Sequence, residues 1–100
     1  MVMTKPRILI TGGSGYLGGG VVRMARANWD VAATYLAHTP DESGADWHRL
    51  DVRDKAQVES LMHQIRPTVV VHTAALNPMQ ATDFDAVNVD GTRHVARAAA

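Results

Sequence analysis

The residues best suited to chemistry lie in the stretch TGGSGYLGGG, residues 11–20, in which six of the ten positions are glycine. Gly12, Gly15 and Gly18 are spaced three residues apart and directly follow the apolar run at residues 7–11. A glycine that ends a strand permits a tight turn, a second lets a pyrophosphate approach the backbone, and a third lets the next helix pack closely on the strand. The start of that helix would offer unpaired N–H groups and a partial positive charge to the phosphates. The spacing predicts a nucleotide-binding loop, although a flexible glycine loop without a ligand would have the same composition.

The composition limits what kind of protein this chain can be. Its 100 residues suffice for one small domain, residues 1–100, and ten basic residues balance ten acidic ones. A neutral chain argues against a nucleic-acid partner and against a polybasic membrane anchor. No apolar run reaches the roughly 18 residues of a membrane span, and the N-terminus lacks the apolar segment of a secretory signal. With no cysteine and only scattered histidines, we expect no metal site. The expected location is cytoplasmic.

Strands and helices are predicted to alternate along the chain. Short apolar or β-branched runs predict strands at residues 7–11, 30–35, 47–50 and 68–73. Such alternation implies parallel strands joined by right-handed crossovers. The predicted fold is an α/β, Rossmann-type doubly wound parallel sheet with strand order 3-2-1-4. The strand at residues 68–73 would then be an open apolar edge, which proteins normally cover.

Three helical segments complete the pattern. The helix predicted at residues 16–27 should bury Leu17, Val21 and Met24, with Ala25 a further candidate for that face. Asn28 follows it as a residue that tolerates the left-handed conformation of helix ends. A third helix is predicted at residues 83–100.

The helix between these two has the clearest signals. Asp54 is the predicted N-cap, with Gln57 three residues on, and Pro67 lies just beyond the helix end. Its buried face should be the stripe of Val58, Leu61, Met62 and Ile65.

Four motifs in order carry a family resemblance: TGGSGYLG at residues 11–18, LDVRD at 50–54, VVVHTAAL at 69–76 and NVDGTRHVARAA at 88–99. Together they resemble the extended short-chain dehydrogenase/reductases, the NAD-dependent epimerase/dehydratase superfamily. The sequence and spacing of residues 50–76 are most similar to the dTDP-4-dehydrorhamnose reductase branch. The resemblance implies an NAD(P)-dependent oxidoreductase or epimerase whose partners are a dinucleotide cofactor and a nucleotide-linked sugar. These 100 residues would be its N-terminal, cofactor-binding part.

The resemblance also implies which residues contact the cofactor: Gly12, Gly15, Tyr16, Leu17, Gly18, Tyr35, Asp51, Val52, Thr73, Ala74, Ala75, Leu76 and Asn88. Asp51 would accept a hydrogen bond from the adenine amino group while Val52 packs on the ring. The small residues from Thr73 onward would let a ribose pass close to the backbone, and Asn88 would reach the nicotinamide ribose. Alternatives without cofactor contact stay open for two of these residues: Asp51 as an ordinary loop carboxylate, and Asn88 as an ordinary helix-surface residue.

Two further residues are interpreted as structural. His72 is expected to be a packed strand histidine, and Gly91 to admit a close contact between the last helix and the sheet.

Tyr35 departs from the family pattern. The position about 20 residues after the central glycine normally holds an Asp or Glu that binds the adenosine ribose in NAD enzymes, and here that position is Tyr35. No arginine replaces the acid in the sequence, so NAD and NADP both stay possible. Losing the carboxylate removes a repulsion against a 2′-phosphate, and His38 could lie near it. This favours NADP or the use of both.

The family's catalytic pair is a second departure. The chemistry uses Tyr-x-x-x-Lys, yet the residue four beyond Tyr16 is Gly20 and the residue four beyond Tyr35 is Thr39. The sequence also ends in RHVARAAA without a helix stop signal. We therefore expect the catalytic residues to lie beyond these 100. The alternative hypothesis is a non-catalytic NAD(P)-binding sensor or regulatory subunit on the same fold.

Overall fold

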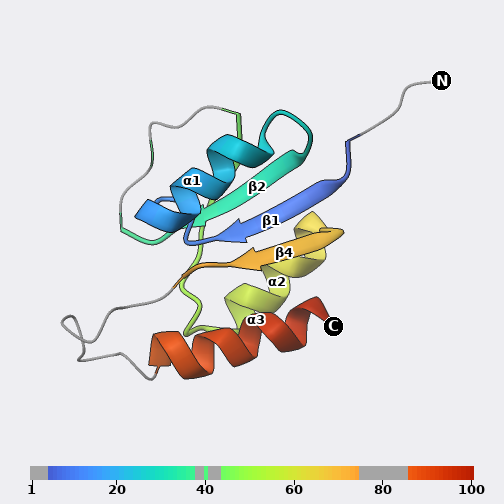
Figure 1. The fold of residues 1–100 in the computed structure, drawn as a ribbon. Helices are drawn as coiled ribbons and strands as arrows, with labels where there is room; N and C mark the ends of the chain where they lie inside the picture. The colour runs from blue at the N-terminus through green and yellow to red at the C-terminus, as the bar shows by residue number, and fades with distance from the viewer. Residues whose placement is uncertain (1–4, 38–39, 41–43, 75–85) are drawn as a thin grey trace.

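The computed structural model describes residues 5–37, 40, 44–74 and 86–100, and of residues 86–88 the backbone alone. Strands and helices follow one another along the chain, and β2 and β3 are consecutive in the element order (Figure 1). In chain order they are β1 (Arg7–Thr11), α1 (Tyr16–Ala25), β2 (Asp30–Tyr35), β3 (Asp46–Arg49), α2 (Lys55–Ile65), β4 (Val69–His72), the π-helix η2 (Ala86–Gly91) and α3 (Thr92–Ala99). β1 and β2 have the predicted bounds, whereas β3 begins and ends one residue earlier and β4 is one residue shorter at each end.

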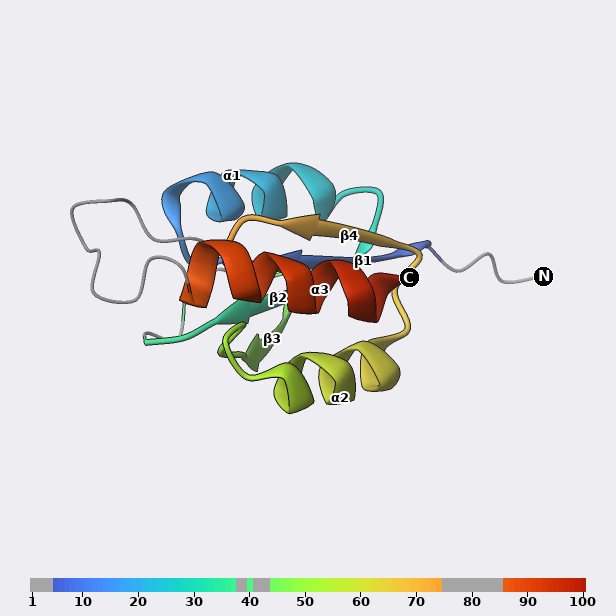
Figure 2. The same cartoon turned by 90° about the horizontal axis from the view of Figure 1, so that it is seen from below.

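The four strands form one parallel sheet in the order β3-β2-β1-β4, as predicted. Helix α1 covers one face, and α2 and α3 cover the other (Figure 2). Alternate residues of a strand point to opposite faces. Ile8 and Ile10 accordingly pack on the α1 side, while Leu9 packs with α2 and α3. The central strand is thus buried on both faces, which explains its continuous apolar run.

The prediction for the buried face of α1 was partly wrong: Ala25 is buried as predicted and Val21 packs against the core, but Leu17 and Met24 do not face the sheet. Leu17 is 67% exposed and Met24 is 82% exposed, whereas Gly18, Val22 and Ala25 face the sheet. The cause is local to Gly18, where an added Cβ would overlap the backbone of the glycine loop. This close approach fixes the rotation of the helix, so residues four and seven positions further on are the ones buried.

Helix α2 follows its sequence signals closely. Asp54 caps it, since Oδ1 accepts from the Gln57 backbone N–H at 3.2 Å and Oδ2 from Gln57 Nε2 at 3.0 Å. The buried residues are the predicted four: Val58, Leu61, Met62 and Ile65. The helix ends at Arg66, whose φ of 50° is left-handed, directly before Pro67. Asn28 has no such conformation, because α1 already ends at Ala25 and continues in a turn.

The last helical segment differs from a uniform helix. Residues 86–91 form a π-helical turn before α3, and residues 83–85 lie outside the described part. A Cβ added at Gly91 would lie 2.6 Å from Cγ2 of Val52. The close contact predicted for this glycine is therefore made with the loop after β3, not with the sheet.

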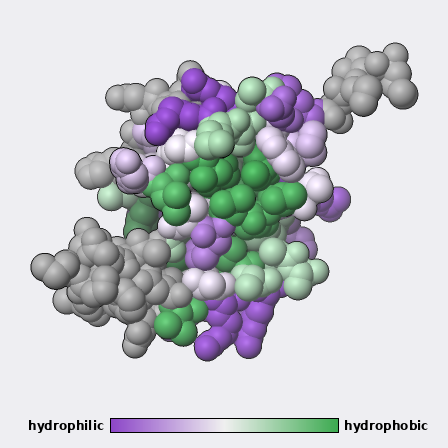
Figure 3. All heavy atoms as spheres, in the orientation of Figure 1, coloured by the Kyte–Doolittle hydropathy of each residue, from purple (hydrophilic) through white to green (hydrophobic). Residues whose placement is uncertain are grey.

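β4 is the last strand in the sheet order, so the apolar edge predicted there is present. Val69 is exposed, and Figure 3 shows apolar surface gathered in the region of β1 and β4. Among the described residues, no helix is both long enough and apolar enough to cross a membrane.

Candidate nucleotide-binding site

The carboxyl ends of all four strands lie at one edge of the sheet, because the strands are parallel. At this edge a pocket of about 220 Å³ is lined by residues from four separate segments: Gly12, Ser14, Gly15, Thr34, Tyr35, Leu36, Leu50, Asp51, Val52, Thr73 and Ala74. Seven of the thirteen residues proposed for cofactor contact are in this lining. Ligands of open α/β sheets bind in such a crevice, where the order of the strands reverses.

The other six proposed residues do not line the pocket, for different reasons. Tyr16 and Leu17 are on the exposed side of α1, and Gly18 is buried beneath the loop. Ala75 and Leu76 lie outside the described residues, and Asn88 is placed in η2 by its backbone alone.

The glycine loop has the geometry that a pyrophosphate cradle needs. Gly12 has a φ of +68°, and a Cβ there would lie 2.7 Å from the Ala74 backbone nitrogen. At Gly15 a Cβ would meet only the Gly12 carbonyl oxygen, at 3.3 Å, and otherwise open space. At Gly18 a Cβ would overlap that same carbonyl and lie 2.6 Å from the Thr73 hydroxyl. The turn and the close packing thus leave the backbone accessible at Gly15.

The start of α1 points its free N–H groups at this loop. Gly15 is the N-cap in an extended conformation, no side chain caps the helix, and the first turn holds no acidic residue. Uncapped N–H groups and the positive end of the helix dipole attract an anion. Residues and geometry together fit a phosphate group.

Only glycine fits at the position of Gly13, and this was not predicted from the sequence. A Cβ there would lie 2.9 Å from both Ala33 Cβ and the Trp47 ring, and its N–H donates to the Thr34 carbonyl at 2.8 Å. The adjacent glycines Gly12 and Gly13 were the only indication in the sequence, because Ala33 and Trp47, which exclude a side chain here, belong to β2 and β3.

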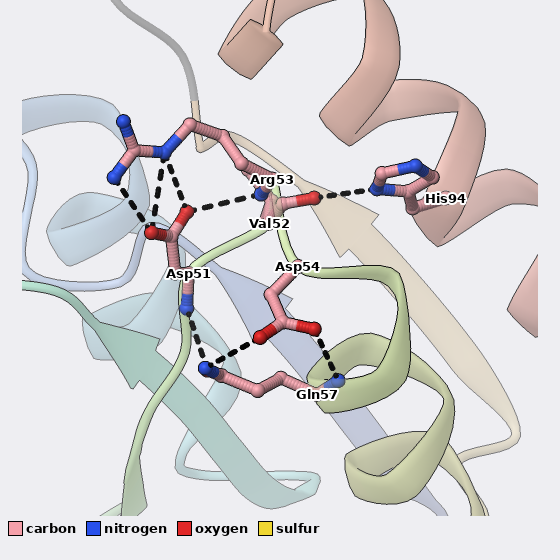
Figure 4. Close-up of polar contacts among 6 residues, drawn as sticks. All are labelled: Asp51, Val52, Arg53, Asp54, Gln57 and His94. Carbon is pink, nitrogen blue, oxygen red and sulfur yellow. Dashed lines mark hydrogen bonds and ion pairs between the residues drawn. The ribbon is translucent and has the colours of Figure 1, made fainter.

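Asp51 is held by Arg53 in a two-point ion pair (Figure 4). Arg53 Nη2 lies 2.7 Å from Asp51 Oδ2, and Arg53 Nε and its backbone N–H donate to Oδ1 at 2.9 and 3.0 Å. The hydrogen bonds from the Arg53 side chain lower the pKa of Asp51, against the opposing effect of burial. The carboxylate is therefore ionised at neutral pH and fixed in orientation. The Asp-x-Arg spacing in LDVRD was an available signal for this pair.

Val52 connects the site to α3. Its carbonyl accepts a hydrogen bond from His94 Nδ1 at 2.9 Å (Figure 4). Its side chain is buried in the core and lies close to Gly91. The contact of Val52 with an adenine ring stays a prediction.

Tyr35 ends β2 and has Arg49 as its register partner on β3. Paired residues of neighbouring strands point to the same face, so the exposed Arg49 leaves the sheet on the same face as Tyr35, the position that lacks the usual carboxylate. The sequence reasoning found no arginine here because Arg49 is distant along the chain. His38 lies outside the described residues.

Fold and pocket together define a Rossmann-type nucleotide-binding unit. The sequence profile described as "NAD dependent epimerase/dehydratase family" matches residues 8–100. The chain belongs to this family.

Curated relatives agree with this membership. The chain is 34% identical over 100 residues to a dTDP-4-dehydrorhamnose reductase of Streptomyces griseus, covering 94% of the chain and 29% of the relative. It is 30% identical over 110 residues to a dTDP-glucose 4,6-dehydratase of Neisseria meningitidis, covering 93% and 31%. A mycobacterial protein of no stated function is 35% identical, with 10% of its length covered. The chain thus spans about a third or less of the relatives it matches.

Solved structures show the same fold. The Bordetella bronchiseptica enzyme WbmG in complex with NAD and UDP superposes with a TM-score of 0.82 at 30% identity, covering 96% of this chain and 34% of that one. The UDP-glucose 4-epimerase of Thermus thermophilus, in complex with NAD, gives a TM-score of 0.81 at 31% identity, covering 92% and 33%.

Proposed function

We propose that these residues form the dinucleotide-binding part of an NAD(P)-dependent oxidoreductase or epimerase that acts on a nucleotide-linked sugar, such as a dTDP-4-dehydrorhamnose reductase-like enzyme. The observation that carries the proposal is the open Cβ position of Gly15 at the uncapped start of α1. Gly15 lines the pocket in which the ends of all four strands meet.

Each part of the pocket has a role in this proposal. The pyrophosphate would lie over Gly15 and accept hydrogen bonds from backbone N–H groups at the uncapped start of α1, because the N–H groups of Gly12, Gly13 and Gly15 already donate within the loop and to Thr34. Asp51 and Val52 receive the adenine, and Thr73 and Ala74 leave room for a ribose. Ala75, Leu76 and Asn88 belong to the same proposal on the family resemblance alone. The bound dinucleotide would supply hydride transfer, which no side chain can provide.

The relatives support a nucleotide-sugar substrate. Two of them are named as enzymes of dTDP-sugars, and WbmG was solved with UDP as well as NAD. The Tyr-x-x-x-Lys pair is not among these 100 residues. The proposed catalysis is therefore attributed to the full-length protein and not to these 100 residues.

For the cofactor we infer NADP, or the use of both dinucleotides. Tyr35 cannot repel a 2′-phosphate as a carboxylate would, and Arg49 on the next strand supplies a positive charge. The two neighbours described above were solved with NAD, so a test must include both forms.

The loss of the ribose carboxylate at Tyr35 also favours a second candidate, a non-catalytic NAD(P)-binding sensor. Turnover of a nucleotide-sugar by the full-length protein would exclude it. Dinucleotide binding without turnover, on a panel of dTDP- and UDP-sugars, would instead support the sensor.

Binding itself is tested by one matched pair of substitutions. Gly15→Val places a side chain where the pyrophosphate would lie, whereas Gly20→Val adds one on an open helix surface, 4.0 Å from the nearest Arg23 atom. Quenching of tryptophan fluorescence by NAD and NADP gives the dissociation constants. We expect Gly15→Val to lose binding and Gly20→Val to keep it, with circular dichroism unchanged in both. Equal affinity in the two variants would show that the loop holds no phosphate.

A further inference from the structure

The hydroxyl of Thr11, at the end of β1, is fully buried and has three polar neighbours. The backbone nitrogens of Thr73 and Ala74 lie 3.1 and 3.4 Å from Thr11 Oγ1. The Nδ1 atom of His72 lies 2.6 Å from the same oxygen. A hydroxyl has one hydrogen to donate and two lone pairs to accept with.

These contacts favour one arrangement of the protons. Both backbone nitrogens can only donate, and both are directed at Thr11 Oγ1, although the Thr73 N–H is shared with the Thr11 carbonyl oxygen at 3.2 Å. We infer that the Thr11 hydrogen points at Nδ1 of His72, which then accepts it and carries no hydrogen of its own. The imidazole hydrogen is then on Nε2, which donates to Thr92 Oγ1 at 3.0 Å. His72 is neutral in this arrangement, and burial lowers its pKa in the same direction.

Thr73 and Ala74 cross directly beneath the glycine loop. The single hydrogen of the Thr73 hydroxyl is donated to the Thr11 carbonyl at 2.5 Å and shared with the Gly12 carbonyl, 3.3 Å away. A Cβ at Gly12 would meet Ala74, and one at Gly18 would meet the Thr73 hydroxyl. A shift of Thr73–Ala74 would therefore move the loop proposed to hold the pyrophosphate.

We propose that His72 is a positioning residue for the dinucleotide. Through the Thr11 hydroxyl its neutral Nε2–H form fixes the segment beneath the glycine loop, and through Thr92 it ties the start of α3 to the same point. This role rests on the proposed function, because it presupposes that a dinucleotide binds at the loop.

Protonation of His72 would break this arrangement. A hydrogen on Nδ1 would face the Thr11 hydrogen across a 2.6 Å gap, so the hydroxyl would have to turn away and lose its acceptor. Affinity for the dinucleotide should therefore fall as the pH drops through the pKa of His72, which burial lowers from the ordinary 6.5.

Among the described residues of β1, η2 and α3, the ion pairs of the charged groups are made with residues other than His72. Arg7, at the opposite end of β1, pairs with Asp30 and Asp46. Asp90 of η2 pairs with Arg93 of α3. His94 donates from Nδ1 to the Val52 carbonyl, a bond that both its neutral and protonated forms make, and Arg97 lies a turn further along α3.

The tautomer can be read without any ligand. Long-range ¹H–¹⁵N NMR spectra of the protein at pH about 7.5 distinguish the two neutral forms of each histidine, and His72→Asn assigns the signal by its loss. We expect the Nε2–H form. A hydrogen on Nδ1 at this pH would overturn the proposal, whether or not a dinucleotide binds.

Dissociation constants for NAD and NADP between pH about 5.5 and 8 test the positioning itself. His72→Phe removes the acceptor and should weaken binding about tenfold at pH 8 and flatten the pH profile. His72→Asn places an amide oxygen near the position of Nδ1 and should restore most of the affinity while keeping the profile flat. His63→Phe, on the exposed side of α2, is the matched control and should behave as the wild type.

The possible results separate the two proposals. An unchanged affinity and pH profile in His72→Phe would overturn the role of His72 and leave the proposed function standing. A wild-type protein that binds neither dinucleotide at any pH would overturn the proposed function, and the positioning role with it.

Discussion

Tyr35 and Arg49 are register partners on β2 and β3, and they leave the sheet on the same face; Tyr35 lines the pocket, and Arg49 is exposed at the end of the neighbouring strand. Neither residue alone indicates which dinucleotide is used. Together they replace a carboxylate by a phenol with a guanidinium beside it. The first two predictions concern this pair.

Tyr35→Asp should strengthen NAD binding and weaken NADP binding. The new carboxylate would accept both ribose hydroxyls, and a charge-assisted hydrogen bond contributes about 1.5–3 kcal/mol, which corresponds to about tenfold to a hundredfold in affinity. The same carboxylate would repel a 2′-phosphate. Both dissociation constants should be measured at one ionic strength. If the preference does not move toward NAD, Tyr35 is not at the ribose.

Arg49→Ala should weaken NADP binding about tenfold and leave NAD binding unchanged, because only NADP carries the 2′-phosphate that the guanidinium would meet. Arg97→Ala, on α3, is the control for the loss of one positive charge. The effect should shrink in high salt, since Arg49 is exposed. A parallel loss of affinity for both dinucleotides would place Arg49 near a group that they share.

The stability of the protein should depend on pH through Asp51. Its folded pKa lies below the ordinary 3.8 because Arg53 donates to the carboxylate, so the unfolded chain binds the proton more readily. This contribution is complete above pH 3.8 and is lost as the pH falls through the lowered folded pKa. Urea midpoints in this acid range should fall less steeply in Asp51→Asn than in the wild type. Identical slopes would mean that the Asp51–Arg53 pair does not persist in solution.

Gly91→Ala should destabilise the fold by about 1–3 kcal/mol, the usual cost of overpacking a core. The added Cβ would lie 2.6 Å from Val52, which is buried and has no room to yield. Gly20→Ala is the opposite case, an open helix position where alanine should stabilise by about 0.5–1 kcal/mol. Thermal unfolding of both variants measures the difference. Wild-type stability in Gly91→Ala would show that η2 and the loop after β3 are not in contact.

Local signals in the sequence were sufficient for several elements. The run at residues 7–11 gave β1 its bounds, and the cap at Asp54 with the apolar stripe after it gave α2 both its start and its buried face. Each of these depends on residues close together in the chain. The strand order followed from the alternation of strands and helices, with the rule that crossovers are right-handed.

Features set by distant residues were not predictable in this way. The rotation of α1 depends on Gly18 packing against both the Gly12 carbonyl and the Thr73 hydroxyl, and the need for Gly13 depends on the Trp47 ring. The position of Arg49 beside Tyr35 depends on the register of two strands. The pattern of apolar residues along the sequence cannot predict such contacts, because they exist only in the assembled sheet.

The hydrogen bond between Thr11 and the Thr73 backbone joins residues 62 positions apart. Its formation requires β4 to dock on the far side of β1 from β2, after the chain between them has been brought round. Contacts of this sequence separation are entropically slow to close. A chain synthesised only as far as β3 already contains every glycine of the loop. It still lacks Thr73 and Ala74, the residues that pack against that loop. The capacity to hold a dinucleotide should therefore arise late in folding, in the step that adds the fourth strand.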